Sequence, residues 1–401
     1  MKKKLLSVLL ATAMVATLAT GCGEAATADT GAEPAATTET EEEAPAAETT
    51  ASDGQTVGIA MPTQSLERWN RDGSYLKEQF ESKGYAVELT YSDNKIDQQV
   101  KDIEGLIADN VDLLVIAAID GESLTQVLGD AKTANIPVIS YDRLIMNTDA
   151  VSYYVSFDNY TVGKLQGEFV EKQLDLANAG DKTYNIEFTA GDPADNNAGF
   201  FFNGAYDVLK KYIDAGTLVV QSGQTDFDKV ATKNWATDEA LKRMQNILAS
   251  YYGDGKTQLD VALCSNDSTA LGVTQAIESD YWGDVKDVII TGQDGDVANL
   301  ANLVDGKQTM TVYKAVANEA VATLDLGVAL LSGETPDAGL ISSAGWGFDC
   351  AYDTESYDNN VAKIPSYLLV PTVVTKDNLE KELVDTGYYT LDANGYPQAT
   401  N

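Results

Sequence analysis

Short apolar runs alternate with amphipathic stretches along most of the chain. Residues 111–119 are apolar almost throughout, which is typical of a parallel strand that is covered on both faces. Ile96, Val100 and Ile103 recur at the spacing of one helix face. Repeated alternation of strands and helices predicts parallel sheets with helices packed on both sides.

The predicted elements form two series, and each has enough strands for one doubly wound sheet. The first series has strands at 56–60, 86–91, 111–119, 137–141 and 152–157, with helices at 67–83, about 96–107 and 123–134. The second has strands at 184–189, 218–221, 261–264, 288–291 and 310–313, with helices at 203–212, 237–252 and 269–278. We therefore expect an α/β fold of two similar Rossmann-like lobes. A helix at 315–331 and an apolar stretch at 367–374 follow, and they are long enough to return the chain to the first lobe and back.

The N-terminal residues predict an export signal. Three lysines at 2–4 precede an apolar stretch at 5–20, which is shorter than the roughly 20 residues that span a bilayer. The stretch ends in Ala-Thr-Gly-Cys22, which resembles the box of a bacterial lipoprotein, although Ala19 stands where Leu is usual. We expect a lipoprotein signal peptide at 1–22 that is lipidated at Cys22, with plain secretion as the alternative.

Residues 23–54 predict an acidic tether. The segment holds nine of the chain's 62 acidic residues, no Lys or Arg, and almost no large apolar side chain. Such a composition cannot bury enough apolar surface to fold by itself. Together with a lipid on Cys22, the tether would hold a globular body away from a membrane.

Composition excludes several classes of function. The 62 Asp and Glu residues outnumber 27 Lys and Arg, giving a net charge of −35, so no basic face for nucleic acid is expected. Histidine is absent, which removes His-based catalytic triads and His metal ligands. Three cysteines are too few for a four-cysteine zinc site, and no run of acids matches a calcium loop. We expect no metal and no cofactor, with Cys264 as a small buried side chain and a Cys264–Cys350 bond left open.

Polar and aromatic side chains follow the predicted strands at the edge where open parallel sheets bind their ligands. They are Arg68-Trp69, Asp120, Asp142-Arg143, Asp195-Asn196-Asn197, Ser265-Asn266-Asp267, Gln293-Asp294 and Lys314. Such groups form paired hydrogen bonds with sugar hydroxyls, which both donate and accept. Trp69, Trp235 and the Phe run 200–202 offer rings for the apolar face of a sugar. An Asx residue after a strand more often caps a helix, but its recurrence at many strand ends favours one shared cleft.

The chain resembles the xylose-binding and multiple-monosaccharide-binding branch of the periplasmic binding proteins over residues 56 to about 390. The segments that carry the resemblance are VGIAMPT (57–63), YDRLI (141–145), DNNA (195–198), GQD (292–294) and PSYLL (365–369). The resemblance implies a type I periplasmic binding protein fold, with two lobes joined by a three-strand hinge. It also implies a monosaccharide between the lobes and delivery to an ABC permease.

The resemblance also assigns lobes and ligand contacts. The implied N-terminal lobe is 55–157 plus 315–367, and the implied C-terminal lobe is 158–314 plus 368–401. Ligand contacts carried over by position fall on Arg68, Trp69, Asp120, Asp142, Arg143, Asn197, Trp235, Asp267, Asp294 and Lys314, with Asn196 and Asn266 as neighbours. One departure is Asn234, which precedes Trp235 where relatives have Arg. We expect an exported, membrane-anchored monomer at the cell surface or in the periplasm.

Three other functions compete with transport. A glycosidase needs a protonated carboxyl group, whereas Arg, Lys and Asn interleaved with the cleft acids would keep them ionised. A DNA-binding regulator needs a helical unit where this chain has a signal and a tether. A sensor that presents bound sugar to a chemoreceptor or kinase ectodomain would use the same lobes and stays open. The sequence does not identify whether the bound sugar is of the xylose, glucose, galactose or arabinose type.

Overall fold

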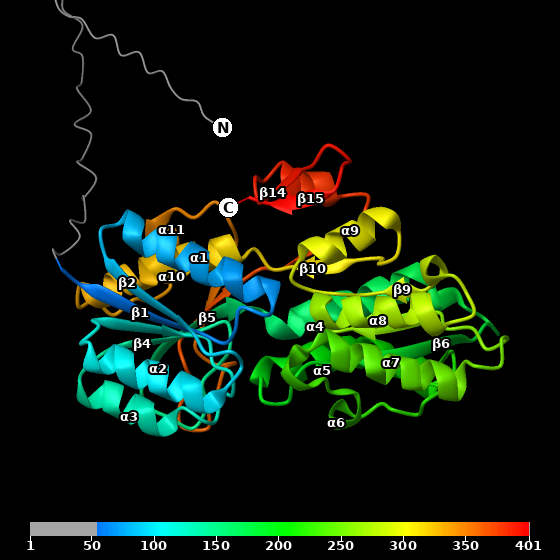
Figure 1. The fold of residues 1–401 in the computed structure, drawn as a ribbon, viewed down its shortest axis with the longest axis horizontal. Coiled ribbons are helices and arrows are strands. Elements are labelled where there is room, and N and C mark those ends of the chain that lie inside the picture. Colours follow the sequence, from blue (N-terminus) through cyan, green and yellow to red (C-terminus); the bar gives the residue numbers. More distant parts are fainter. Residues whose placement is uncertain (1–53, 401) are drawn as a thin grey trace, which may run out of the picture. The chain divides into compact units, whose positions relative to one another are not determined.

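The computed structural model describes residues 54–400, which are organised around two separate sheets (Figure 1). The predicted signal peptide, Cys22 and most of the predicted tether lie outside the described residues. Within residues 54–400 no helix combines the length and hydrophobicity that crossing a membrane requires. We call the seven-stranded sheet with its helices the first lobe, and the remaining elements the second lobe.

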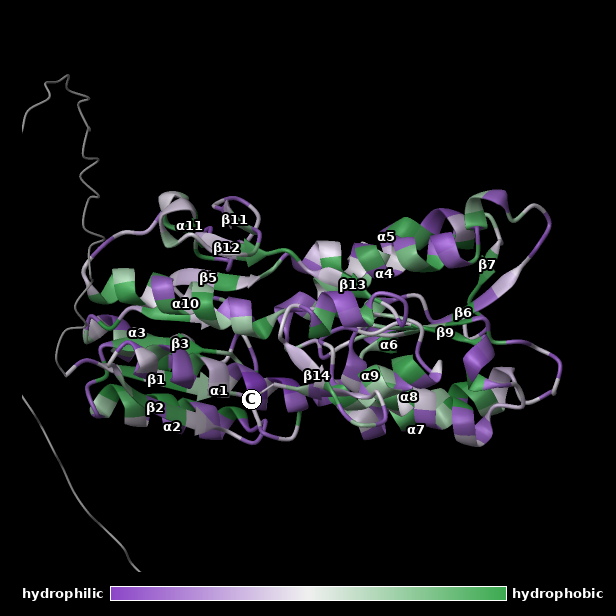
Figure 2. Ribbon diagram, turned by 90° about the horizontal axis from the view of Figure 1, so that it is seen from above, coloured by the Kyte–Doolittle hydropathy of each residue, from purple (hydrophilic) through white to green (hydrophobic). Residues whose placement is uncertain are grey.

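The first lobe is a sheet with the strand order β11-β12-β5-β4-β3-β1-β2, in which only β11 runs antiparallel to its neighbour. Its strands are β1 Thr56–Met61, β2 Ala86–Tyr91, β3 Leu113–Ile116, β4 Val138–Tyr141, β5 Val151–Phe157, β11 Cys350–Asp353 and β12 Ser366–Leu369. Helices α1 Glu67–Ser82, α10 Val316–Leu331 and α11 Gly339–Ala344 cover one face, and α2 Ile96–Ala108 and α3 Thr125–Thr133 cover the other (Figure 1). The apolar strands are buried between these two layers (Figure 2).

The second lobe contains a parallel sheet of strand order β7-β6-β8-β9, and a β-bridge from Gln293 to Val312 connects it to the pair β10-β13. Its strands are β6 Tyr184–Thr189, β7 Leu218–Val219, β8 Val261–Cys264, β9 Ile289–Ile290, β10 Thr311–Tyr313, β13 Thr372–Val374, β14 Tyr389–Leu391 and β15 Pro397–Ala399. Its α-helices are α4 Asn159–Gln173, α5 Asn196–Asp214, α6 Phe227–Val230, α7 Thr237–Tyr251, α8 Asp267–Asp280 and α9 Val297–Asp305. A π-helix at Glu380–Val384 precedes the β14–β15 hairpin.

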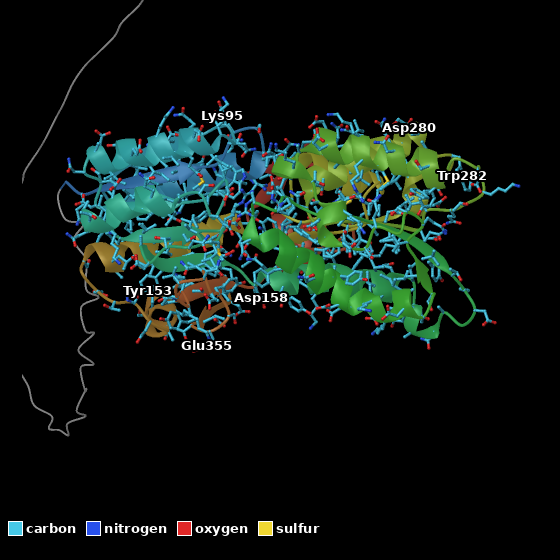
Figure 3. All side chains as sticks on the ribbon, turned by 90° about the horizontal axis from the view of Figure 1, so that it is seen from below. Lys95, Tyr153, Asp158, Asp280, Trp282 and Glu355 are labelled. Atoms are coloured by element: carbon cyan, nitrogen blue, oxygen red, sulfur yellow. The ribbon has the colours of Figure 1, made fainter. Side chains whose placement is uncertain are left out.

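Between residues 54 and 400 the chain passes between the lobes three times. The first passage is at Asp158, between β5 and α4, and Asp158 is labelled in Figure 3. The second is at Lys314 and Ala315, between β10 and α10. The third is at Val370 and Pro371, where the apolar stretch predicted at 367–374 divides between the two sheets. These passages bring the carboxyl ends of both sets of strands to the boundary between the lobes.

Helix α5 begins earlier than the predicted 203–212, at Asn196. The Asp195 side chain caps it by accepting a hydrogen bond of 3.0 Å from the Asn197 amide. The first turn contains Asn, Asn and Gly, which are poor helix formers, so the sequence pattern did not reveal it. Just after this turn α5 packs closely against α4, since a Cβ on Gly163 would lie 1.9 Å from the Phe201 carbonyl oxygen.

Candidate functional site

A pocket lies between the lobes at the carboxyl ends of the strands. The space free of protein atoms across it is about 360 Å³, open solvent included. Its lining residues are Leu66, Arg68, Trp69, Asp142, Arg143, Asp195, Phe201, Trp235, Asn266, Ser268, Gln293, Asp294 and Lys314. Both lobes and the second passage between them therefore contribute side chains to one site.

Three pocket residues have an unusual backbone conformation. The φ angles of Asp142, Trp235 and Asp294 are +58°, +55° and +98°, in the region that residues other than glycine rarely adopt. Backbone strain of this kind costs about 1–3 kcal/mol per residue and clusters at functional sites. Three of the eleven residues other than glycine that have a positive φ within residues 54–400 lie in this pocket, which is consistent with a functional role.

Arg68 is the centre of a buried ion-pair network. Its Nη2 lies 2.6 Å from Asp142 Oδ2 and 3.3 Å from Glu319 Oε2, and its Nε lies 3.2 Å from Asp72 Oδ2. Its Nη1 reaches across the lobe boundary to within 3.5 Å of Asp294 Oδ1. Four carboxyl groups thus fix the guanidinium, and one of the four belongs to the second lobe.

Lys314 supplies a second cation from the passage between β10 and α10. Its side chain is only 1% exposed, and Nζ lies 3.3 Å from Asp142 Oδ2 and 3.4 Å from Asp294 Oδ1. The ammonium group also lies over the rings of Phe157 and Phe201, 5.7 and 5.4 Å from their centroids. Lys314 lies in a passage between the lobes and bridges an acid of each lobe. It therefore connects the pocket to the hinge.

Two tryptophans complete the pocket walls. The guanidinium carbons of Arg68 and Arg143 lie 4.8 and 4.9 Å from the Trp69 ring centroid, which is cation–π geometry. Trp235 donates from Nε1 to Asp195 Oδ2 at 3.2 Å, which fixes the orientation of its indole. The pocket therefore presents apolar ring surface next to charged groups.

The charges in the pocket pair with each other. Burial alone would raise the pKa of Asp142, but Arg68, Lys314 and Arg143 outweigh it and lower that pKa to about 2. Burial raises the pKa of Glu319 well above its usual value, so this acid tends to be neutral. Three basic groups then face three acidic groups in the lining, which are Arg68, Arg143, Lys314 and Asp142, Asp195, Asp294, and Asp72 pairs with Arg68 from behind. Because these charges already pair with each other, a neutral polar ligand fits the lining better than a ligand with a net charge.

Three buried polar atoms of the pocket form no hydrogen bond within residues 54–400. They are Arg143 Nε, Gln293 Oε1 and Asp294 Oδ1. Arg143 Nε lies 3.0 Å from Asp195 Oδ2 but outside hydrogen-bonding geometry. Buried polar groups normally find partners, so this set of one donor and two acceptors suits a ligand whose groups both donate and accept.

Eight of the twelve predicted contact residues line the pocket, and four do not. Asp120 is half-buried and accepts a hydrogen bond of 2.8 Å from the Glu122 amide, so it stabilises a turn. Asn196 is half-buried at the start of α5. Asn197 is fully buried behind the pocket, where its Nδ2 donates to the Asp142 carbonyl at 2.6 Å and holds that residue in place.

Asp267 also lies outside the pocket and has a structural role. It is fully buried, and its Oδ2 accepts hydrogen bonds of 2.9 Å from the amides of Gly295 and Asp296. Its other oxygen accepts from Gln308 Nε2 at 2.9 Å. The carboxyl group therefore holds the loop that presents Asp294 to the pocket.

The prediction omitted five residues that line the pocket. Asp195 and Gln293 stood among the polar groups after strands, and Phe201 belongs to the aromatic run, so a sequence signal existed for all three. Leu66 and Ser268 carried no such signal. Apart from the helical i,i+4 spacing of Arg68 and Asp72, nothing in the sequence predicted the buried acids behind Arg68.

Neither a metal nor a disulfide contributes to the site. Among residues 54–400, no group of three or more His, Cys, Asp and Glu side chains is placed to hold a metal ion. Cys264 is buried as expected, and Cys350 is half-buried in β11. Both are free, so the bond between them that the sequence left open does not form.

Gly191 is expected to be essential for the position of Trp235. A Cβ at residue 191 would lie 1.9 Å from the indole Cη2, so Gly191→Ala must displace the ring from the pocket wall. We expect at least a tenfold loss of ligand affinity with little change in far-UV circular dichroism. Gly199→Ala is a matched control, because a Cβ at residue 199 has no neighbour within 4 Å. Equal affinities for both variants would contradict this role.

Stability is expected to fall as pH rises from about 4.5 to 8. Burial raises the pKa of Asp296 to about 7, despite the nearby Arg71, and burial also raises the pKa values of Asp195, Asp267 and Glu319. In the folded state each of these groups keeps its proton at pH values where the unfolded state, with a pKa of about 4, has lost it. The free energy of unfolding therefore falls as pH rises through that interval. Urea unfolding at pH 5 and pH 8 measures the slope. Asp296→Asn should flatten it, and a stability maximum near pH 8 would contradict the prediction.

Comparison with known proteins identifies the family. Residues 57–335 match the periplasmic binding protein domain. The multiple sugar-binding periplasmic receptor ChvE of Rhizobium radiobacter is 41% identical over 348 residues, covering 86% of this chain and 94% of ChvE. The D-xylose-binding periplasmic protein of Escherichia coli K12 is 33% identical over 333 residues, covering 83% of this chain and 90% of that protein.

A solved structure agrees with these relatives. The crystal structure of an ABC transporter solute binding protein from Clostridium phytofermentans, with bound β-D-glucose, is 48% identical and has a TM-score of 0.78. The match covers 84% of this chain and 98% of that one. Members of this family are exported binding proteins and not enzymes, as the sequence predicted. The chain therefore belongs to the periplasmic binding proteins of type I fold, in the branch that contains the multiple sugar-binding and D-xylose-binding proteins.

Proposed function

We propose that this protein captures a monosaccharide of the glucose, xylose, galactose or arabinose type in the pocket between its lobes. It then delivers the sugar to an ABC permease. The observation that carries the proposal is a buried pocket in which three basic side chains pair with acidic ones beside two indole rings. The names of ChvE and the D-xylose-binding protein, and the glucose in the Clostridium structure, support this ligand class.

The chemistry of the pocket fits a neutral polyol better than other small ligands. Each sugar hydroxyl both donates and accepts, so it can bond to Arg68 or Lys314 and to Asp142 or Asp294 at once. Hydrogen bonds to charged groups contribute about 1.5–3 kcal/mol each, and a few of them, less ordering costs, reach the roughly 8 kcal/mol of micromolar affinity. A phosphorylated sugar or an amino acid would bring charge that the paired groups of the lining do not compensate.

The proposed mechanism is closure of the lobes around the sugar. Arg68 and Asp142 belong to the first lobe, Asp294 belongs to the second, and Lys314 lies in a passage between them. A sugar that bonds to groups of both lobes gains contacts only when the lobes are closed, so it shifts the equilibrium toward the closed form. The permease would then recognise this closed form.

Intrinsic fluorescence tests the ligand class, because two of the four tryptophans line the pocket. Residues 55–401 are titrated with xylose, glucose, galactose, arabinose and ribose. We expect a saturable change with at least one aldose, which Trp69→Phe and Trp235→Phe reduce. Trp282 is 51% exposed outside the pocket, so Trp282→Phe is the matched control and should keep the response. No fluorescence change with any of the five sugars, together with no heat of binding in calorimetry, would contradict the proposal.

Membrane anchoring through Cys22 is a separate part of the proposal. It rests on the sequence around Cys22 and on the acidic segment that follows. We expect the native protein in the membrane fraction of its host and the Cys22→Ser variant in the soluble fraction or the medium. The same fractionation for both proteins would contradict the anchor. Sugar uptake by a strain that lacks the gene separates the two roles. Uptake should fall if the protein delivers sugar to a permease, and it should stay unchanged if the protein is a sensor.

A further inference from the structure

A second set of contacts joins the lobes outside the sugar pocket, and Arg71 of α1 is its centre. Arg71 does not line the pocket. Its Nη2 lies 3.3 Å from Asp296 Oδ1 in the second lobe and donates to the Asp294 carbonyl at 3.2 Å. Its Nη1 donates to the Gly295 carbonyl at 3.1 Å and to the Tyr389 hydroxyl. The Arg71 side chain is 11% exposed and that of Asp296 is 8% exposed, so the contact is largely removed from water.

Two neighbours of Arg71 on α1 extend the contact. The Glu67 carboxylate accepts hydrogen bonds of 3.1 and 3.2 Å from the Val297 amide, at the first residue of α9. A carboxylate at a helix N-terminus is stabilised by the free amides and the helix dipole. One helix turn after Arg71, the Tyr75 hydroxyl donates to the Thr400 carbonyl at 3.0 Å. A single face of α1 therefore binds both the start of α9 and the C-terminal segment.

The loop that Arg71 binds also supplies the pocket. The Asp294 side chain faces Arg68 and Lys314 in the pocket, while the Asp294 carbonyl accepts from Arg71. Asp267 keeps this loop in one conformation through the amides of Gly295 and Asp296. A displacement of the loop from α1 would therefore also move Asp294 relative to Arg68.

We propose that Arg71 is a positioning residue that latches α1 to residues 294–296 and Tyr389, and that this latch controls how long the closed lobes retain their ligand. The latch stabilises closure without touching the ligand. Its effect on sugar retention rests on the proposed function, but its effect on closure does not. The strongest support is that four acceptors of the second lobe converge on one guanidinium of the first lobe.

Pulsed electron–electron distance measurements test the latch without sugar. Nitroxides are attached to Lys95→Cys in the first lobe and Asp280→Cys in the second, both labelled in Figure 3, in the full chain carrying Cys22→Ser and Cys350→Ser. Cys264 is buried, and burial raises its thiol pKa, so it should not react. We expect the sugar-free parent to contain a closed fraction at the shorter distances, which Arg71→Ala lowers and Arg71→Lys restores in part. Lys77→Ala, which removes an exposed charge from the same helix, should match the parent.

Stopped-flow release of glucose or xylose is the second readout. We expect Arg71→Ala to raise the dissociation rate about tenfold and to change the association rate less than twofold. A double-mutant cycle with Asp296→Ala should show less than additive effects, because both residues belong to one contact. Distance distributions for Arg71→Ala that match the parent would overturn the latch. If the parent protein binds no sugar, the proposed function fails, and the distance measurement alone decides the latch.

Discussion

Lys314→Ala is expected to abolish sugar binding while leaving both lobes folded. The ammonium group is 1% exposed and bridges Asp142 of the first lobe and Asp294 of the second. Its removal takes one positive charge and a donor to the ligand away from the pocket. Truncating one partner of a buried, hydrogen-bonded charge pair costs about 2–5 kcal/mol in binding, which corresponds to an affinity loss of about 30-fold or more. Arg68 continues to pair with both acids, so the fold should persist.

Calorimetry and thermal unfolding measure the two parts of this prediction. The matched control is Lys307→Ala, which removes a partly exposed lysine that pairs with Glu278 at 2.7 Å on the surface of the second lobe. Exposed ion pairs contribute about 0–1 kcal/mol, so this variant should keep parental affinity and stability. Parental affinity in Lys314→Ala would remove Lys314 from the site. Loss of the folded state would show that the lysine is needed for the fold instead.

Gly163→Ala is expected to have the largest effect on stability. Helices α4 and α5 touch through glycines of both helices, since a Cβ on Gly163 would lie 1.9 Å from the Phe201 carbonyl oxygen and one on Gly204 would lie 2.2 Å from that of Tyr160. Backbone atoms cannot rotate away, so the helices must separate. Overpacking costs about 1–3 kcal/mol or more, and we expect at least about 3 kcal/mol here. Because Phe201 lines the pocket, sugar affinity should fall as well.

Urea unfolding provides the measurement for Gly163→Ala. Gly199→Ala on α5 is the control, because the added Cβ meets nothing within 4 Å and alanine favours the helix by about 0.5–1 kcal/mol. The control should equal or exceed the parent in stability. A Gly163→Ala protein within 0.5 kcal/mol of the parent would show that the two helices can separate at little cost.

The sequence predicted the edge of the sheets where the pocket lies, because parallel strands place their carboxyl ends on one side. It could not predict the direction of each side chain. Asn266 lines the pocket, whereas the next residue, Asp267, points into the second lobe and binds the 295–296 amides. This difference depends on α8 starting at Asp267 and on the loop folding back over it. Both are tertiary features that no local pattern encodes.

The strands show the same limit: the local pattern predicts where they lie approximately, but not their exact ends or their pairing. Apolar runs marked the strands, but β3 extends only from Leu113 to Ile116 within the apolar run 111–119. The stretch at 367–374 looked continuous, yet Val370 and Pro371 divide it between two sheets. Proline lacks an amide donor and interrupts a strand, which was visible in the sequence. The partner sheet of each half was not visible, because β13 pairs with β10 and β12 with β5, both more than 50 residues distant, and only β11 is a nearer partner of β12.

A crystal structure of residues 55–401 grown with D-glucose or D-xylose would show whether the pocket between the lobes binds a monosaccharide. We expect one sugar between the lobes, with its ring next to Trp69 or Trp235. Its hydroxyls should lie within hydrogen-bonding distance of Asp142, Asp294 and at least one of the cations Arg68, Arg143 and Lys314. A sugar bound elsewhere, or a pocket in which the acids and cations pair only with each other at saturating sugar, would contradict it.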